Sequence, residues 1–435
     1  MVSDVVSGFG DPGRSGVYRT GGVTRRPSVA WRADTGAAVL STPVLVDDML
    51  YAVDVRGVVH AFDAADGTSQ WRSDGVDAEW DQLDPLITTA LAVWGDLLFL
   101  PDQEYEGCVF VHDRSTGELL HRLEGGAGCC TIVGDILLLT DVSDGVRALD
   151  LPGLTLRWHN ETRTGLLEAG PAISESGVAF AALGFEGHHT HSGVVAFDVS
   201  SGTEVFQVGD DQGGRCPVET EVLSPEEDDF DDEGPSDWVL FGQAHPVVAE
   251  GLVWMPVRRE HHDDGFHPAP YISAEVVGLD PATGQRRWLF QLDPGLWSEV
   301  YGAVAVADGS VFFTALQGGD PEVQEQPAGD VMLYAVDIAT ARPAWTARLP
   351  GSPVGSPVLS GGLLYVAMRN GTVATYHAAT GELAWSLDID EKIVGSQYEL
   401  GAEHYGEDYE EESLAVLPAD GTVYVRTRAG IFALR

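Results

Sequence analysis

The chain repeats a pattern of about 30 residues, and this repeat restricts its fold more than any other feature. The segment from Ser356 to Trp385 aligns without a gap to the segment from Thr42 to Trp71, at an offset of 314 residues. Eleven of the 30 positions are identical, including a proline, a leucine–tyrosine pair, two glycines and the final tryptophan. Repeats of this length are typical of solenoids and propellers, so we expect an array of similar units.

Each copy of the repeat has the pattern of four short strands. A tight two-residue turn follows the first strand, and the Gly, Asp, Ser and Glu residues found there suit the positive φ of tight hairpins. A second tight turn separates the third strand from the fourth. The eight turns of the first kind are Asp47-Asp48, Gly95-Asp96, Gly134-Asp135, Ser176-Gly177, Glu250-Gly251, Asp308-Gly309, Gly361-Gly362 and Asp420-Gly421.

Two further positions recur in the repeat. The third strand usually ends in an Asp, which we interpret as an acceptor for turn amides. The fourth strand carries a large ring, which we expect to fill the wedge against the next unit and, where it is Trp, to place its N–H on a backbone carbonyl. The aspartates are Asp63, Asp113, Asp150, Asp198, Asp280 and Asp337, and the rings are Trp71, His121, Trp158, Phe206, Trp288, Trp345 and Trp385.

The eighth copy lacks its fourth strand, because the chain ends after the third. The segment PSVAWRAD, which carries Trp31, precedes the first complete copy and can supply the missing strand. We therefore predict an all-β fold: one domain over residues 1–435, an eight-bladed β-propeller of four-stranded antiparallel blades. Residues 27–38 would close the last blade and 1–26 would form an N-terminal extension. A linear solenoid is the alternative, but it leaves the Trp31 strand unexplained.

The insertions are distributed unequally between the two faces of such a ring. In a four-stranded antiparallel blade, the first–second and third–fourth turns share one face, which we call the turn face. The second–third loops and the blade-to-blade connections share the other, which we call the connection face. All long insertions fall on the connection face, where function usually resides. They are 101–107, 184–192, 207–243, 258–273, 317–329 and 388–412, of which 207–243 and 388–412 are the acidic insertions.

The charge of the chain is strongly negative. It has 68 acidic and 24 basic residues, a net charge of −44, and a single lysine, Lys392. A dense anionic surface suits a protein that stays soluble in concentrated salt, so we expect a halophilic source; an acid-biased proteome is the alternative. Nucleic-acid binding is disfavoured because it requires a basic patch. The N-terminus has no signal-peptide pattern and no apolar run spans a membrane, so we expect a cytoplasmic protein without membrane insertion.

The repeat resembles a known family. The segment FGDPGRSG, then WRADTG, then copies of SPV…LYV…G-x-V…T-G…W is similar to the PQQ-like (pyrroloquinoline-quinone-type) β-propeller repeat. Members of that superfamily include the noncatalytic outer-membrane-assembly scaffold BamB and the quinoprotein alcohol dehydrogenases. The resemblance covers roughly residues 8–435 and implies the propeller fold.

The dehydrogenase branch of that family implies a calcium-bound quinone in the central channel, an Asp base, a Trp platform and an adjacent-cysteine pair. This chain offers the pair Cys129-Cys130. Its only asparagines are Asn160 and Asn370, so an Asn calcium ligand is hard to place. We therefore expect no PQQ with calcium and no catalytic residues. We also expect both cysteines to be reduced, because adjacent cysteines form only a strained disulfide.

Two histidine-rich segments are candidate metal ligands. HHTH and HHDDGFH fall in the second–third loops of the fourth and fifth copies, which would lie side by side on the connection face. Imidazoles with carboxylates can bind zinc or a similar divalent ion, and two solvated polar loops are the alternative. The candidate ligands are His188, His189, His191, His261, His262 and His267.

Taken together, these features predict a noncatalytic scaffold that binds a protein partner through its acidic connection face. The partner would be a basic protein or peptide. A propeller that binds a ligand or metal ion, with or without redox activity, is the alternative.

Overall fold

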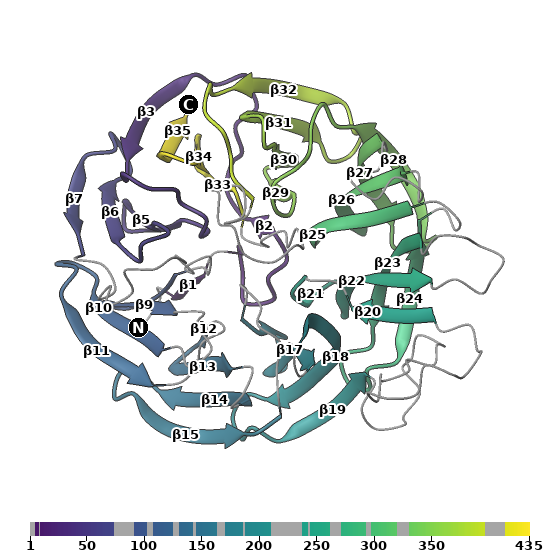
Figure 1. The fold of residues 1–435 in the computed structure, drawn as a ribbon, viewed down its shortest axis with the longest axis horizontal. Coiled ribbons are helices and arrows are strands. Elements are labelled where there is room, and N and C mark those ends of the chain that lie inside the picture. The colour runs from purple at the N-terminus through teal and green to yellow at the C-terminus, as the bar shows by residue number, and fades with distance from the viewer. Residues whose placement is uncertain are drawn as a thin grey trace.

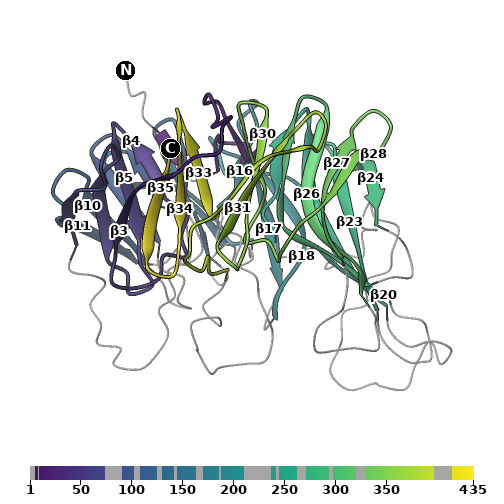
Figure 2. The same cartoon turned by 90° about the horizontal axis from the view of Figure 1, so that it is seen from above.

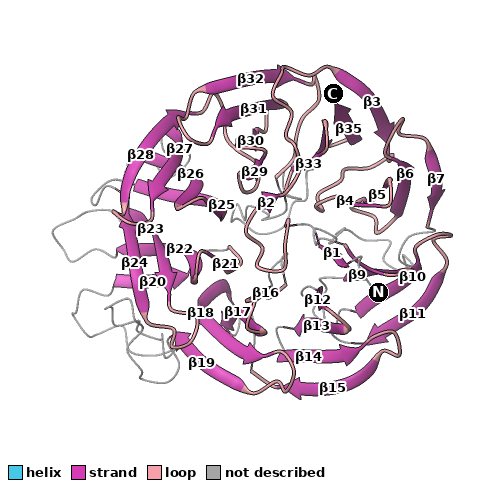
Figure 3. Ribbon diagram, turned by 180° about the vertical axis from the view of Figure 1, so that it is seen from behind, coloured by secondary structure: helices cyan, strands magenta, loops and turns pink. Residues whose placement is uncertain are grey.

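The computed structural model describes residues 5–7, 9–73, 91–101, 108–124, 130–141, 145–162, 170–185, 188–209, 237–241, 244–261, 271–292, 297–319, 330–395 and 414–435. These residues form strands and turns and contain no helix (Figure 3). Eight four-stranded antiparallel blades surround a common centre (Figure 1), so the predicted eight-bladed β-propeller is confirmed.

Blades 1 to 4 follow the order of the chain. Blade 1 contains β4 (Val44–Val46), β5 (Met49–Val53), β6 (Val59–Asp63) and β7 (Ser69–Arg72). Blade 2 contains β8 (Ala92–Trp94), β9 (Leu97–Pro101), β10 (Cys108–Asp113) and β11 (Leu119–Glu124). Blade 3 contains β12 (Cys130–Val133), β13 (Ile136–Asp141), β14 (Gly145–Asp150) and β15 (Thr155–Asn160). Blade 4 contains β16 (Ala172–Ile173), β17 (Val178–Phe185), β18 (His188–Asp198) and β19 (Glu204–Gly209).

Blades 5 to 8 complete the ring. Blade 5 contains β21 (Val247–Ala249), β22 (Leu252–His261), β23 (Tyr271–Leu279) and β24 (Arg286–Gln291). Blade 6 contains β25 (Trp297–Ala307), β26 (Ser310–Gly319), β27 (Asp330–Asp337) and β28 (Arg342–Arg348). Blade 7 contains β29 (Val358–Ser360), β30 (Leu363–Ala367), β31 (Thr372–His377) and β32 (Leu383–Asp388). Blade 8 contains β33 (Val416–Ala419), β34 (Thr422–Arg426), β35 (Gly430–Leu434) and the N-terminal β3 (Val29–Asp34).

The two ends of the chain close the ring. Strand β3 pairs antiparallel with β35, so Val29 lies opposite Leu434 and Asp34 opposite Gly430. Two reciprocal backbone hydrogen bonds between Ser28 and Arg435 extend this ladder, from Ser28 N to Arg435 O at 2.7 Å and from Arg435 N to Ser28 O at 2.9 Å. The last blade therefore has its full four strands, and the predicted closure by an N-terminal strand is confirmed.

Blades 4 and 5 are joined into one nine-stranded sheet, which the sequence pattern did not predict. Strand β20 (Asp237–Phe241) lies within the acidic insertion 207–243 and pairs with five residues of β22 on one side. On its other side, Phe241 pairs with His191 of β18. Figure 2 shows β20 at the edge of the ring opposite the first–second turns. Hairpin β22–β23 has nine residue pairs, and hairpins β17–β18 of blade 4 and β26–β27 of blade 6 have eight each, so long second–third hairpins also occur without β20.

The tight turns have the predicted backbone. Each of the eight first–second turns contains at least one residue with positive φ, for example Asp47 and Asp48 at 50° and 63°. The third–fourth turn of blade 3 differs in detail from the expected Pro152-Gly153, because Leu154 carries the positive φ of 51° there.

The fourth-strand rings form the wedges between blades, as predicted, with the exception of His121, which is exposed. A Cβ on the turn glycine of the next blade would come within 2.4 to 2.8 Å of the ring at Gly67, Gly117, Gly202, Gly284 and Gly381. Only a residue without a side chain lets a ring lie flat there. The indole N–H groups that reach the next blade are Trp31 to Ala64 O (3.2 Å), Trp71 to Arg114 O (3.1 Å), Trp158 to Val199 O (2.9 Å), Trp288 to Ile338 O (2.9 Å) and Trp345 to Ala378 O (2.9 Å).

Candidate functional site

The N-terminal extension runs through the middle of the ring, where Figure 1 shows it in purple near β2 (Val17–Tyr18). It begins beside blade 2, where β1 (Val5–Ser7) pairs with β8. It then reaches blade 7, where β2 pairs in parallel with β29. We call residues 9–18 the hub segment. The sequence placed these residues only in an extension, so their position at the centre is a finding of the structure.

Backbone hydrogen bonds tie the hub segment to the first strands of four successive blades. Each bond joins a strand amide to a carbonyl of the hub segment, so every contact is independent of side-chain identity. The bonds are Ile173 N to Pro12 O (2.7 Å), Val248 N to Gly13 O (2.7 Å), Val306 N to Ser15 O (3.1 Å) and Leu359 N to Gly16 O (2.9 Å). All four amides lie close to the first–second turns. The hub segment therefore covers the centre on the turn-face side.

Small residues make this path possible. A Cβ on Gly13 would lie 2.3 Å from the Val248 carbonyl oxygen, and one on Gly10 would lie 2.4 Å from the Val17 carbonyl oxygen. Gly10 also has φ of +90°, where a side chain would be strained. Asp11 shapes the bend by accepting hydrogen bonds from the amide and the hydroxyl of Ser15. This is the physical reason for the glycine spacing in FGDPGRSG.

Arg14 anchors the hub segment among the inner edges of blades 3 and 4. Its side chain is buried and donates from Nη2 to Thr131 Oγ1 at 2.9 Å and from Nε to Pro171 O at 3.3 Å. The guanidinium also lies 4.9 Å from the centroid of the Phe9 ring. Phe9 in turn contacts the buried His245 edge-on, with ring centroids 4.4 Å apart. Burial and then the charge of Arg14 lower the pKa of His245 well below its ordinary value, so this imidazole is neutral at neutral pH.

The described residues on the covered side of this centre do not fit a calcium-bound quinone. Calcium takes six to eight oxygen ligands, of which carboxylates are the strongest. The one carboxylate of the hub segment, Asp11, has both oxygens engaged by Ser15. The other described groups on the covered side include the Arg14 cation, the neutral His245 and the Cys130 thiol. Burial raises the pKa of Cys130 to about 12, so the thiol is protonated, and it is a free cysteine. No catalytic step through a quinone follows from this arrangement. Cys129 and Cys216 lie outside the described residues.

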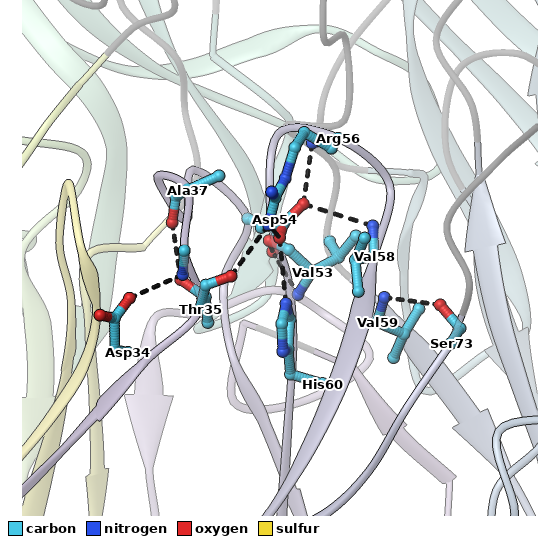
Figure 4. Close-up of polar contacts among 12 residues, drawn as sticks. Asp34, Thr35, Ala37, Val53, Asp54, Arg56, Val58, Val59, His60 and Ser73 are labelled. Atoms are coloured by element: carbon cyan, nitrogen blue, oxygen red, sulfur yellow. Dashed lines mark hydrogen bonds and ion pairs between the residues drawn. The ribbon is translucent and has the colours of Figure 1, made fainter. Parts of the chain in front are cut away.

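A buried carboxylate organises the second–third turn of blade 1 on the connection face (Figure 4). The Asp54 side chain is fully buried and accepts from Arg56 Nη2 at 2.6 Å, while His60 Nε2 lies 3.0 Å from its Oδ2. Its Oδ1 accepts the amide of Arg56 at 2.9 Å. Burial alone raises the pKa of Asp54, but hydrogen bonds from His60 and Arg56 outweigh it and hold the pKa below its ordinary value. With its oxygens occupied by turn donors, Asp54 has a structural role.

Five of the six aspartates that end the third strands accept turn amides, as predicted, whereas Asp150 Oδ1 accepts from Arg157 Nε at 2.5 Å. Asp113, Asp198, Asp280 and Asp337 accept turn amides two or three residues later through Oδ1. Asp63 does the same with Ala65 at 2.8 Å. These carboxylates are engaged in local turns, which leaves them poorly suited as catalytic bases.

The structure places part of each histidine segment in a strand. His188, His189 and His191 belong to β18, not to a loop, and His261 is the last residue of β22. Strand β20 separates the two segments: Phe241 pairs with His191, and Asp237 pairs with His261. Side chains of these four histidines, and all of His262 and His267, lie outside the described part of the chain. The metal site therefore stays a prediction.

Among the described residues, no group of three or more His, Cys, Asp and Glu side chains could hold a metal ion. Within the same residues, no helix is long and apolar enough to cross a membrane. Residues 210–236 and 396–413, which make up most of the two acidic insertions, are not described.

The role of the hub segment was not predicted from the sequence. The carbonyls of this segment accept from strands more than 150 residues away, as the bond from Ile173 N to Pro12 O illustrates. The available signal was the run of glycines at positions 10, 13 and 16, around an Asp and a Ser that cap a turn.

Solved structures share this fold at low sequence identity. Quinohemoprotein alcohol dehydrogenase from Comamonas testosteroni is 13% identical, with a TM-score of 0.62 over 98% of this chain and 79% of that chain. The quinohemoprotein alcohol dehydrogenase ADHIIG from Pseudomonas putida HK5 is 14% identical, with a TM-score of 0.66 over 99% and 80%. BamB from Moraxella catarrhalis is 13% identical, with a TM-score of 0.53 over 93% and 94%. Such likeness establishes the fold and not the activity.

The family comparison covers almost the whole chain. No curated protein sequence matches it. The sequence profile of the family described as "Outer membrane protein assembly factor BamB" matches residues 26–127, 106–319, 272–398 and 329–434. The chain therefore belongs to this family of PQQ-type β-propellers.

Proposed function

We propose that this propeller is a noncatalytic scaffold that binds a protein partner through its connection face. The hub segment is the observation that carries the proposal. It covers the centre of the ring on the turn-face side with the chain's own backbone, and its buried Phe9 and Arg14 side chains lie there beside the buried His245. A partner or ligand at the centre would therefore approach from the connection face.

The charge of the chain supports a basic partner. With a net charge of −44, the protein attracts cationic surfaces, over a screening length that shortens as the salt concentration rises. The acidic insertions 207–243 and 388–412 belong to the connection face by their place in the chain. We propose that a basic protein or peptide docks there, with the closed ring as a rigid frame.

The single lysine allows a direct test of the face. Lys392 is exposed, and its carbonyl accepts the amide of Arg428 from the second–third turn of blade 8 at 3.0 Å, so it lies on the connection face. Apart from the N-terminal amine, an amine-reactive cross-linker can attach only to this residue. Cross-linking in the cells that produce the protein, at their own salt concentration, should join Lys392 to a protein with an isoelectric point above 7.

A matched variant moves that amine to the turn face. Lys392→Arg combined with Arg342→Lys keeps the net charge and places the only side-chain amine at the exposed start of β28, next to a third–fourth turn. The proposal expects the cross-link to disappear in this variant. Cross-links that persist undiminished, or that form only from position 342, would contradict docking on the connection face.

Catalysis is tested separately. The purified protein, incubated with calcium and pyrroloquinoline quinone at high salt, should show no dye-linked oxidation of alcohols. Turnover in this assay would overturn the scaffold proposal in favour of a dehydrogenase.

A metal-binding propeller is the second candidate function. Strand β20 favours it, because this one strand pairs with both His191 and His261 and so joins the two histidine segments in a single sheet. Imidazoles from both segments would supply ligands for zinc or a similar ion. Metal analysis of untagged protein that finds no stoichiometric zinc, nickel, copper or iron would rule this candidate out.

A further inference from the structure

Both asparagines of the chain stand in the same three-residue pattern. They are the only two among 435 residues, and each is followed two residues later by threonine: Asn160-Glu161-Thr162 and Asn370-Gly371-Thr372. Asn-x-Thr, where x is not proline, is the acceptor pattern for N-linked glycosylation. Each asparagine is thus a potential acceptor.

The two patterns adopt the same local geometry. In each, the threonine amide donates to the asparagine Oδ1, at 2.9 Å for Asn160 and 3.1 Å for Asn370, which forms an Asx turn. Asn160 ends β15, where the chain leaves blade 3, and Asn370 lies in the second–third turn of blade 7. Both therefore lie on the connection face.

The turns themselves do not require asparagine. Asp34, Asp54 and Asp388 accept the amide two residues later through Oδ1 at 2.7, 2.9 and 2.9 Å. These aspartates occupy the ends of fourth strands and a second–third turn, as the asparagines do. A carboxylate fills the role of acceptor as well as an amide does. The Asn160 Nδ2 has a structural role, because it donates to Gly202 O at 3.1 Å. In a chain with 68 acidic residues, the amide nitrogen of Asn370 and the threonine at both sites need another explanation.

We propose that Asn370 is an N-glycosylation site of this protein and that Asn160 is a second, less occupied one. Asn370 is exposed in the folded chain, and in the described structure its hydrogen bond is made through Oδ1 and not through Nδ2. Asn160 is half-buried, and its Nδ2 donates to Gly202 O of blade 4 at 3.1 Å. Modification at Asn160 must therefore precede the packing of blade 4, whereas Asn370 stays accessible.

The reaction is a glycosyl transfer from a phosphate-activated sugar. The bond between sugar C1 and the phosphate oxygen breaks, and its electron pair leaves with the phosphate. A bond forms between C1 and Asn Nδ2, and Nδ2 loses one proton to a base. One N–H remains on the nitrogen, so a modified Asn160 can still donate to Gly202 O.

Peptide mass spectrometry of the protein isolated from its natural cells tests the proposal. Peptides that contain Asn370 should carry a hexose- or hexosamine-based increment, at higher occupancy than peptides that contain Asn160. Natural Asn370 peptides that are all unmodified would overturn the proposal. The cell fraction that contains the modified protein identifies the sugar donor. Modified protein in the cytosol implies a nucleotide-linked sugar, and modified protein outside the cytosol implies a lipid-linked sugar.

Three variants, each expressed in the same cells, separate the modification from folding. Asn370→Asp keeps the turn acceptor and should melt as the wild type does while losing the increment. Thr372→Val keeps the donating amide but removes the hydroxyl, and should also lose it. Thr372→Ser keeps the hydroxyl and should retain it. An increment that survives in Thr372→Val would contradict recognition of the Asn-x-Thr pattern.

Discussion

The wedge between blades 6 and 7 can be tested with one pair of substitutions. Gly381 and Gly309 both have φ of +72°. A Cβ on Gly381 would lie 2.5 Å from Cε3 of Trp345, whereas a Cβ on Gly309 would have no heavy atom within 4 Å. Gly381→Ala and Gly309→Ala therefore share the same backbone strain, and they differ in the contact with the tryptophan ring.

The magnitudes follow from these contacts. An alanine at positive φ costs roughly 1–2 kcal/mol, and this is the whole expected effect of Gly309→Ala. In Gly381→Ala the ring must retreat by about 1 Å to restore an ordinary carbon–carbon contact of about 3.5 Å. Crowding of this kind costs about 1–3 kcal/mol, and loss of the indole bond to Ala378 O, 2.9 Å long, adds about 1 kcal/mol. We expect Gly381→Ala to lose about 2–4 kcal/mol more than Gly309→Ala.

Denaturant unfolding followed by tryptophan fluorescence is the appropriate assay. Melting temperature is a weak readout here, because an unfolding entropy of about 2.1 cal/mol/K per residue converts 1 kcal/mol into only about 1 °C in a chain of 435 residues. Comparison of midpoints at a common slope gives the difference directly. Equal losses in the two variants would refute the wedge argument. So would a difference that survives in a Trp345→Ala background, where the ring is absent and the two substitutions should become equivalent.

Three other predictions concern the hub segment and the charge. Arg14→Ala removes the donor to Thr131 and Pro171 and should lower the free energy of unfolding by about 2–4 kcal/mol, measured with denaturant. The control Arg19→Ala, at an exposed position, should change it by no more than about 0.5 kcal/mol. Similar losses in the two variants would contradict the role of Arg14 as an anchor. The pKa of His245 in the folded protein lies well below its unfolded value of about 6.5, so below pH 6.5 the unfolded chain binds a proton that the folded protein does not. The contribution of His245 to the free energy of unfolding should therefore be constant above pH 6.5 and should fall below it by up to about 1.4 kcal/mol per pH unit. His245→Gln should lack this part of the slope between pH 7.5 and 5.5, and an unchanged slope would disprove the assignment. Salt from 0.1 to 1 M shortens the screening length from about 10 to about 3 Å, so the thermal midpoint of a chain with net charge −44 should rise; a fall would argue against salt adaptation.

Much of the fold could be predicted because the repeat depends on interactions between residues that are close in the sequence or at equivalent positions of neighbouring copies. In each copy the ring follows the third–fourth turn by four or five residues, so the ring of one blade lies against the same turn of the next blade, as Trp345 lies against Gly381. The aspartates that end the third strands satisfy amides two or three residues away, so their role depends only on neighbouring sequence. Closure of the ring could be predicted from the number of strands, because the last copy lacked its fourth strand and the strand that carries Trp31 belonged to no other copy.

The candidate site was less predictable, for a physical reason. Strand β20 lies in the acidic insertion, and its pairing partners, β18 and β22, come from two different blades. The histidine segments were expected in loops because polar residues interrupt the apolar alternation. In the structure His191 pairs with Gly184 and Phe241, and His261 pairs with Tyr271 and Asp237, so the same residues continue strands. Pairing between distant segments thus overrode the local pattern.

The sequence by itself determined the number of blades, the turns, the wedge residues and the closing strand, because each is encoded in a pattern that repeats along the chain. Only the tertiary structure decided what occupies the centre. The first strands of four blades leave backbone amides that point inward, and a buried amide needs an acceptor. The carbonyls of residues 12–16 supply those acceptors across separations of more than 150 residues. No repeat unit contains this information, because the need arises only when the ring closes.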